Sequence, residues 1–222
     1  MVANRIANNL RNSQRKCARP VVLSLSYVGI DLAGSPRRPT GACIINRRLR
    51  VRCFVVHSDD EIMRLVEQSG SRIVAIDAPL ALPIGRHCLG EHCRGREHFR
   101  TCDLALRRMR IRFFPITLGP MRMLTKRGMG LRKKLEKRHI EVIETFPGAS
   151  QDLLGIRRKQ HGLKSLQESL KALGCSGDIM KRQLTGDELD AVSCALVATD
   201  YSRGRYLAIG NPPEIMMILP RK

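Results

Sequence analysis

The sequence predicts a mixed α/β fold built around one sheet, and three observations lead to this expectation. The chain of 222 residues has the length of one domain, and its 43% apolar residues are enough to fill a core. Short apolar segments bounded by turn residues alternate with segments of helical periodicity. Three strand-like segments come in direct succession near the start, whereas a helix precedes the fourth. We therefore expect antiparallel strands followed by parallel ones.

The first half of the chain is expected to contain four strands and one helix. Turn residues at Gly34-Ser-Pro and Asn46-Arg-Arg separate the first runs, which predicts an antiparallel meander. Ser58 can cap a helix whose first turn is acidic and whose apolar residues recur at helical spacing. The expected elements are strands at 27–31, 41–45 and 51–56, a helix at 59–69 and a buried strand at 72–77.

The second half is expected to return to a strand and then to become mainly helical. Thr185-Gly-Asp-Glu188 is a capping-box pattern that predicts the start of the last long helix. The expected elements are a helix at 102–110, a strand at 141–146, helices at 149–155, 161–173 and from 185 onward, and strands at 207–210 and 214–219.

Basic charge is concentrated in one part of the chain. The sequence has 40 Lys plus Arg against 20 Asp plus Glu, a formal charge of +20, and the stretch 94–138 alone has 15 basic residues against three acids. Such an excess suits a phosphate-rich partner, although an anionic membrane surface would also attract it. We expect residues 27–222 to form a single domain with a basic insertion at about 84–140, preceded by a disordered basic extension over 1–26.

Several classes of protein are excluded. No apolar run approaches the roughly 18–20 residues that a membrane-spanning helix needs. The N-terminal lead is too long and polar for a signal peptide, so a cytoplasmic location is expected. Of the eight cysteines, Cys43, Cys53 and Cys194 lie in apolar segments, which favours reduced thiols over a disulfide framework.

Four aspartates occupy positions at which the predicted elements would bring them together. Asp31 and Asp77 each end an apolar strand, and they become neighbours if these strands pair in parallel. Asp187 and Asp190 open the last long helix and share one of its faces. Carboxylates are the ligands that Mg²⁺ or Mn²⁺ prefers, and such a cluster can hold two ions about 3.5–4 Å apart for phosphodiester hydrolysis.

Glu144, near the end of a predicted strand, is a fifth candidate for the catalytic cluster. The alternative is that these acids are structural, because aspartate at a strand end often caps a turn and acids are favoured in the first turn of a helix. Glu188 fits that alternative as the last residue of the capping box, and it is left outside the site. The catalytic prediction rests on the joint placement of the acids.

Three arginines of the basic stretch are candidates for substrate binding, namely Arg100, Arg112 and Arg122. A guanidinium group can form bidentate contacts with phosphate oxygens. Arg107 and Arg108 could equally lie on a solvated helix face. Three Tyr and five Phe with no Trp offer little for base stacking, so we expect recognition of the backbone of a duplex or junction.

A cluster of cysteines and histidines lies at the start of the basic stretch. Cys88, Cys93 and Cys102, with a nearby histidine, could supply the four tetrahedral ligands of a structural Zn²⁺. Their spacing lacks a C-x2-C knuckle, so the alternative is a basic loop that becomes ordered only on substrate. The histidine candidates are His87, His92 and His98.

Six motifs resemble the domain of unknown function 429 family, whose members are predicted nucleases with an RNase H-like fold. The resemblance covers about 27–220 and implies a mixed sheet of three antiparallel strands and then parallel strands, flanked by helices. It also implies carboxylates at the first strand, the fourth strand and a C-terminal helix, which Asp31, Asp77, Asp187 and Asp190 match. The motifs are Gly29-Ile-Asp-Leu-Ala-Gly-Ser35, Ala75-Ile-Asp-Ala-Pro79, Arg100-Thr-Cys-Asp103, Gly119-Pro-Met-Arg122, Glu144-Thr-Phe-Pro-Gly-Ala149 and Asp187-Glu-Leu-Asp-Ala191.

The leading functional hypothesis is a Mg²⁺- or Mn²⁺-dependent nuclease that hydrolyses DNA or RNA at a two-metal carboxylate site. The first alternative is a nucleic-acid-binding protein without catalysis. A phosphotransferase of the actin-like ATPase type is less favoured, because those enzymes pair two such cores and this chain has room for one. The sequence also has no G-x-x-x-x-G-K-[ST] loop. A homodimer would suit a junction substrate.

Overall fold

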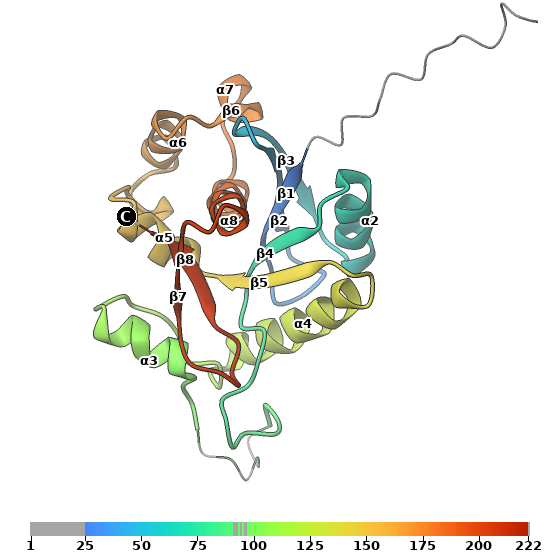
Figure 1. Cartoon of the computed structure of the whole chain (residues 1–222), viewed down its shortest axis with the longest axis vertical. Helices are drawn as coiled ribbons and strands as arrows, with labels where there is room; N and C mark the ends of the chain where they lie inside the picture. The colour runs from blue at the N-terminus through green and yellow to red at the C-terminus, as the bar shows by residue number, and fades with distance from the viewer. Residues whose placement is uncertain (1–24, 91–92, 94, 96, 222) are drawn as a thin grey trace, which may run out of the picture.

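The computed structural model describes residues 25–90, 93, 95 and 97–221, and in this part of the chain eight strands form one mixed sheet (Figure 1). Most of the expected N-terminal extension, residues 1–24, lies outside it. The strand order across the sheet is β6-β3-β2-β1-β4-β5-β8-β7. The strands are β1 Ser26–Asp31, β2 Thr40–Asn46, β3 Arg50–Val56, β4 Ile73–Asp77, β5 Glu141–Thr145, β6 Ser176–Gly177, β7 Tyr206–Ile209 and β8 Met217–Pro220.

The pairing of the strands confirms the expected change from antiparallel to parallel. β1, β2 and β3 form an antiparallel meander, and β4 lies on the other side of β1 and runs parallel to it. β5 and β8 continue the parallel part, and β7 closes that side as an antiparallel strand. The predicted mixed sheet with flanking helices is therefore present.

The predicted helices are also present, with small shifts of their ends. Ser58 caps α2 as expected, because its hydroxyl accepts a hydrogen bond from the amide of Glu61 at 3.2 Å. The helices are α2 Asp59–Ser69, α3 Thr101–Arg108, α4 Gly119–Glu136, α5 Pro147–Leu153, α6 Leu163–Ala172, α7 Asp178–Lys181 and α8 Gly186–Ser202, with a 3-10 helix η1 at Lys159–His161.

Helix α4 was not predicted, and it makes up a large part of the basic stretch at 94–138. Its side chains Leu131 and Leu135 are fully buried against the sheet. A Cβ on Gly128 would lie 2.9 Å from the Cβ of Ala78 and 3.0 Å from the carbonyl oxygen of Pro79, so the helix packs closely on the chain that leaves β4. This part of the expected insertion is therefore a layer of the fold and contributes to its core.

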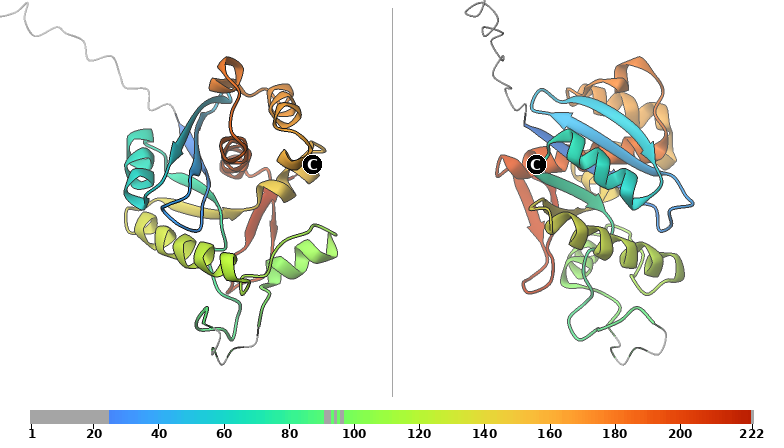
Figure 2. Two further views of the ribbon diagram at one scale, coloured as in Figure 1. Left: turned by 180° about the vertical axis from the view of Figure 1, so that it is seen from behind. Right: turned by 90° about the vertical axis from the view of Figure 1, so that its right-hand side faces the viewer.

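The sheet is covered on both faces, which gives three layers (Figures 1 and 2). Side chains of β1 and β4 alternate between the two faces, as the period of two requires. Ile30 and Ile76 pack with α2 and α4. Tyr27 and Ala75 pack with α8. Both faces of the central strands are buried, which explains why their sequences read as continuous apolar runs.

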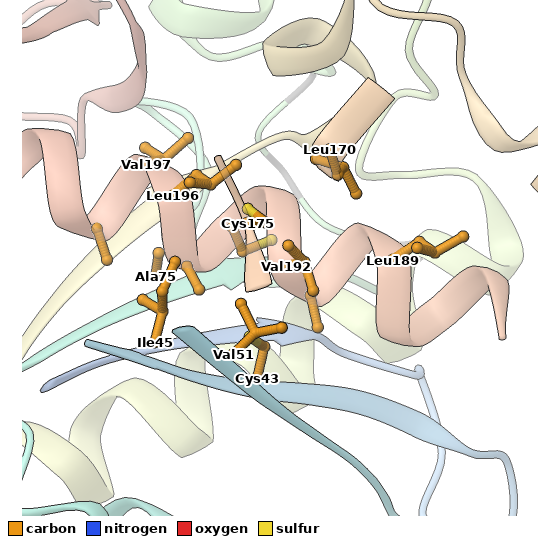
Figure 3. Close-up of a cluster of buried hydrophobic side chains, with 14 of the residues drawn as sticks. Cys43, Ile45, Val51, Ala75, Leu170, Cys175, Leu189, Val192, Leu196 and Val197 are labelled. Atoms are coloured by element: carbon orange, nitrogen blue, oxygen red, sulfur yellow. The ribbon is translucent and has the colours of Figure 1, made fainter. Parts of the chain in front are cut away.

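Helix α8 is buried almost all round, with every residue of 188–199 in the interior. Figure 3 shows Val192 of α8 near Cys43 and Val51 of the sheet, and Leu170 of α6 on the other side of the helix. A helix enclosed in this way carries apolar or small residues on all its faces. Its two aspartates at the start are therefore exceptions that need a reason.

A third apolar cluster joins α3 to the last two strands of the sheet. Cys102 and Leu106 of α3 pack against Ile209, Met217 and Leu219. Helix α3 is thereby fixed beside the β7–β8 hairpin, close to the carboxyl ends of the parallel strands (Figure 1). Among the helices described here, none combines the length and apolar character needed to cross a membrane.

Candidate active site

Two aspartates lie side by side at the carboxyl ends of two central strands, because β1 and β4 run parallel and each ends in Asp. Asp31 and Asp77 are direct register partners. Their side chains leave the sheet on the face covered by α8, two positions after Gly29 and Ala75 of the same strands. The predicted neighbourhood of these two residues is confirmed.

Helix α8 brings two further aspartates to the same place. Thr185 caps the helix by accepting a hydrogen bond from the amide of Glu188 at 3.2 Å, and the Glu188 carboxylate accepts one from the amide of Thr185 at 2.9 Å. The expected capping role of Glu188 is thus confirmed. Asp187 and Asp190 lie close enough to Asp31 to raise its pKa electrostatically.

Two glycines determine how closely α8 approaches the sheet. A Cβ on Gly29 of β1 would overlap the carbonyl oxygen of Ala191, and one on Gly41 of β2 would overlap the carbonyl group of Asp187. The backbone of α8 therefore lies directly on β1 and β2. Because Gly41 is the register partner of Asp31, this contact places the start of α8 against the end of β1.

Gly29→Ala is expected to destabilise the protein by about 1–3 kcal/mol, because the methyl group forces the backbones of β1 and α8 apart. The free energy of unfolding from urea titration measures this loss. The matched control is Gly130→Ala in α4, where a Cβ would meet no atom within 4 Å. That change is expected to stabilise the helix by about 0.5–1 kcal/mol. Equal stability of Gly29→Ala and the wild type would contradict the close approach.

Lys159, in the 3-10 helix η1, connects three of the four aspartates. Its ammonium nitrogen lies 2.7 Å from Asp190 Oδ2, 3.4 Å from Asp187 Oδ1 and 3.5 Å from Asp31 Oδ2. Sequence reasoning missed this residue, and no local signal marks it, because it stands in an ordinary basic run between two helices. It supplies one positive charge to a cluster of four carboxylates.

The carboxylates at the strand ends resist ionisation. Burial raises the pKa of Asp31 to about 7, with a contribution from Asp190 and Asp187 that Lys159 only partly offsets. Burial and the charge of Asp31 raise the pKa of Asp77 well above its usual range. Burial disfavours the charge of Lys159, but the carboxylates outweigh it and raise the pKa of that ammonium group. The cluster thus has more negative charge than its lysine can balance.

Asp77 and Asp190 differ in how they are held. The amide of Gln151 in α5 donates a hydrogen bond to Asp190 Oδ1 at 2.7 Å and another to Ser193 at 3.0 Å, which fixes Asp190 beside Lys159. Within the part of the chain that the structure describes, the side chain of Asp77 forms no hydrogen bond or ion pair. Of the four carboxylates, that of Asp77 therefore has the least compensation for a negative charge, and a bound cation would stabilise its ionised form.

Glu144 lies close enough to Asp77 for its charge to help raise the pKa of that carboxyl, but it does not share Lys159 with the other acids. It is the register partner of Ile76, whereas Asp77 pairs with Thr145, so Glu144 points to the other face of the sheet. There it accepts hydrogen bonds from Arg100 at 2.6 Å and from the amide of Leu80 at 2.8 Å. Its second oxygen, Oε1, is buried without a described partner. The fifth predicted acid therefore lies near Asp77, but it points to the other face of the sheet and is held by Arg100.

The three arginines predicted to bind substrate have different surroundings. Arg100 is only 2% exposed, and it binds both Glu144 and Asp103 in a buried ion-pair network. Arg122 donates a hydrogen bond to the carbonyl oxygen of Thr117 at 2.7 Å. Arg112 is exposed. Of the three, Arg112 has the surroundings expected of a phosphate ligand.

A large open pocket connects the acids to the basic residues. Its volume is about 1060 Å³, and it lies between the carboxyl ends of the parallel strands, α3 and the segment 111–115. Asp77, Asp190 and Lys159 line one part of it, and Arg107, Arg110 and Arg112 line another. Two aspartates of the cluster and the exposed arginines therefore line one cavity.

Metal-binding groups are not preformed in this arrangement. Among the residues that the structure describes, no three Asp, Glu, His or Cys side chains are placed to hold a metal ion as they stand. Lys159 stands among the aspartates, so an ion would have to displace its ammonium group. The donors nevertheless suit Mg²⁺ or Mn²⁺ in kind, because all are carboxylates and that of Asp77 has no described partner.

The cysteines of the predicted zinc site are not alike. Cys102 is fully buried in the third apolar cluster, and burial raises the pKa of its thiol. A hydrogen bond with Cys88 lowers the pKa of Cys93 to about 7. His92 lies outside the described residues. Zinc at these cysteines stays a prediction.

Together these features define an α/β protein whose mixed sheet carries an aspartate cluster at the carboxyl ends of two parallel strands. The chain belongs to the family described as "Protein of unknown function (DUF429)", whose model matches residues 29–215. The expected family membership is therefore confirmed over most of the chain. A comparison with curated proteins gives no match.

Proposed function

We propose that this protein is a metal-dependent nuclease with an RNase H-like fold that hydrolyses phosphodiester bonds of DNA or RNA. The observation that carries this proposal is the meeting of Asp31 from β1, Asp77 from β4 and Asp190 from α8, two of which, Asp77 and Asp190, line a pocket that also has exposed arginines. The sheet supports the fold assignment, because three antiparallel strands are followed by parallel strands in the order that the family resemblance implies.

Asp31, Asp77, Asp187 and Asp190 would hold Mg²⁺ or Mn²⁺. Bound there, the cation would supply an activated water and stabilise the leaving oxygen of a phosphodiester. A positive ion at this position would also relieve the repulsion that raises the pKa of Asp31. Two divalent ions would balance the charge of four carboxylates, which one lysine does not.

The chain's own residues would prepare the site for the substrate. Gln151 holds Asp190 in place through its amide, and this leaves Asp190 Oδ2 directed at Lys159. Once released from the aspartates, the Lys159 ammonium could contact a phosphate oxygen in the same pocket. Arg112 would bind a neighbouring phosphate and hold the strand across the aspartates.

A second candidate function is nucleic-acid binding without catalysis. It is favoured by the ion pairs of Lys159, which give Asp31, Asp187 and Asp190 a structural partner that needs no metal. In that case the acids would fix η1 against α8, and only the basic surface would be functional. Cytoplasmic location and a homodimer stay predictions under either function.

The deciding experiment is a cleavage assay on single-stranded, duplex, hybrid and branched nucleic acids with Mg²⁺ or Mn²⁺, with release of phosphate from ATP measured in parallel. Strand cleavage by the wild type and none by Asp77→Asn is the expected result. Asp60→Asn is the matched control, since Asp60 is exposed in the first turn of α2 on the opposite face and should leave cleavage unchanged.

Two other outcomes would overturn the proposal that the protein is a nuclease. Tight, salt-sensitive binding of nucleic acid with no cleavage under any condition would establish the binding protein instead. Release of phosphate from ATP without strand cleavage would point to a phosphotransferase.

A further inference from the structure

The pocket gathers most of the protein's phenylalanines. The chain has five Phe, and four of them, Phe99, Phe113, Phe114 and Phe146, line this one cavity although they come from different parts of the chain. The small number of aromatic residues in the sequence argued against base stacking. Their concentration in one pocket beside the aspartates favours it.

Three of these rings form the structured wall of the pocket. Phe99 meets the edge of Phe113 in a T-shaped contact with ring centroids 5.9 Å apart, and the guanidinium of Arg107 lies 5.3 Å from the centroid of Phe99. The guanidinium of Arg158 lies 5.7 Å from the centroid of Phe146. These two guanidinium–ring pairs bring aromatic faces and positive charge together in the lining of one pocket.

Among the four phenylalanine rings of the pocket, Phe114 is the one exposed to solvent. Its side chain is 68% exposed and it lines the pocket, whereas the neighbouring Phe113 is partly buried against the third apolar cluster. An exposed ring costs free energy in water, and stacking under a planar apolar group would recover that cost. Phe114 is therefore the position at which a base can stack.

The charge of the pocket wall specifies the rest of the ligand. Arg107, Arg110 and Arg112 are exposed, and within the described residues none of them forms an ion pair. Arg158 differs, because it is held by Asp152 through bonds of 2.9 and 2.5 Å. Three guanidinium groups without an ion pair in the same pocket as an exposed aromatic ring are complementary to phosphates that flank an unstacked base.

The size and position of the cavity favour a strand over a free nucleotide. The volume of about 1060 Å³ lies at the upper end of the roughly 300–1,000 Å³ typical of small-molecule sites, and the pocket is open to solvent, so a strand can enter and leave it. The cavity also reaches Asp77, Asp190 and Lys159, so a strand lying in it would pass over the aspartates. In a continuous duplex both faces of each base are covered by neighbours, and Phe114 would find no partner.

We propose that this pocket binds a nucleic-acid strand at an unpaired nucleotide, whose base stacks on Phe114 while its phosphates contact Arg110 and Arg112. This inference deepens the proposed function and rests on it for the position of the cut, which falls beside the unpaired base. The substrate class is then single-stranded or locally unpaired nucleic acid, in place of the uninterrupted duplex backbone expected from the sequence.

The test is equilibrium binding in the presence of a chelator, so that no strand is cut and the result does not depend on catalysis. The probes are a duplex with one unpaired nucleotide, the same duplex with an abasic residue at that position, a full duplex and a free nucleoside monophosphate. The wild type is expected to bind the unpaired base at least about fivefold more tightly than the abasic probe, the lower end of what one stacked base contributes.

Phe114→Ala should abolish the difference between the base and the abasic probe, since the exposed ring can be removed without a cavity in the core. Met180→Ala, which removes a side chain 60% exposed on α7, is the matched control and should keep that difference. Arg112→Ala should weaken binding of all strand probes and reduce the salt dependence by about one phosphate contact.

Several results would overturn the proposal. They are equal affinity of the wild type for the base and abasic probes, a difference that survives Phe114→Ala, tightest binding of the full duplex, and a free nucleotide that binds as tightly as the strand probes. If the base preference is found but no strand is ever cleaved with Mg²⁺ or Mn²⁺, the nuclease fails while the stacking site stands. If cleavage occurs without a base preference, the stacking site alone fails.

Discussion

Asp31→Asn is expected to unfold at a higher temperature than the wild type in mildly alkaline buffer without divalent cations, and to have lost strand cleavage. The two effects have one cause. Burial raises the pKa of Asp31 to about 7, so above that pH the folded protein must carry a charge that its surroundings disfavour. Asparagine keeps the shape without the charge, but it cannot ligate a metal ion as a carboxylate does.

The sign of the pH dependence follows from proton linkage. The folded pKa of Asp31 lies above its ordinary value of 3.8, so between these values the folded state binds a proton that the unfolded chain releases. Stability of the wild type is therefore lost as pH rises from about 4 to about 7. Three units at about 1.4 kcal/mol each set a ceiling of about 4 kcal/mol. With Asp31 15% exposed and Lys159 nearby, about 1–2 kcal/mol is expected.

Thermal unfolding of the two proteins across this pH range measures the difference. The gain of Asp31→Asn should vanish below about pH 4, where Asp31 is protonated in both states. Addition of Mg²⁺ should raise the melting temperature of the wild type and leave that of Asp31→Asn unchanged. A lower melting temperature for Asp31→Asn in alkaline buffer would mean that Lys159 fully stabilises the ionised carboxylate.

Arg100→Met is expected to destabilise the protein by about 3–5 kcal/mol, because the carboxylates of Asp103 and Glu144 would lose the guanidinium they share inside the protein. Burial already raises the pKa of Glu144, and Arg100 is the main influence in the opposite direction. Urea unfolding at neutral pH measures the loss, and Arg112→Met, at an exposed position, is the matched control.

The double variant Arg100→Met, Glu144→Gln separates charge from packing. It should recover part of the loss, since one of the two uncompensated carboxylates is then neutral. If Arg100→Met is as stable as the wild type, the network contributes nothing measurable. If the double variant is no better than the single one, lost packing of the long arginine side chain explains the effect.

The parts of the fold that the sequence predicted are those with local signals. The capping residues Ser58 and Thr185 mark helix starts, and apolar runs that end in Asp31 and Asp77 mark the two parallel strands. Because a helix precedes the fourth strand, that strand was expected to run parallel to its neighbour, and it pairs in this way with β1. The meeting of Asp31 and Asp77 followed from that pairing without further information.

Other features depend on contacts between distant parts of the chain. Helix α4 was missed because the prediction for this stretch rested on its charge, whereas the helix is held by its apolar face on the sheet and by the close contact of Gly128 with Ala78. Arg100 was predicted to bind phosphate, but its guanidinium is bound by Glu144, which lies far along the chain. Lys159 and the four pocket phenylalanines likewise have no local pattern that marks them.

The direct contact of α8 with the sheet has a consequence for how sequence change can reach the site. Main-chain atoms of α8 rest on Gly29 and Gly41, with no side chain between them. At these two points the distance between α8 and the sheet is therefore set by main-chain contact and by the absence of a Cβ. Exchanges such as Val192→Ile or Leu196→Met would alter stability while leaving the aspartates in place. A larger residue at Gly29 or Gly41, in contrast, would move the start of α8 relative to the end of β1 and so change the distances among the aspartates.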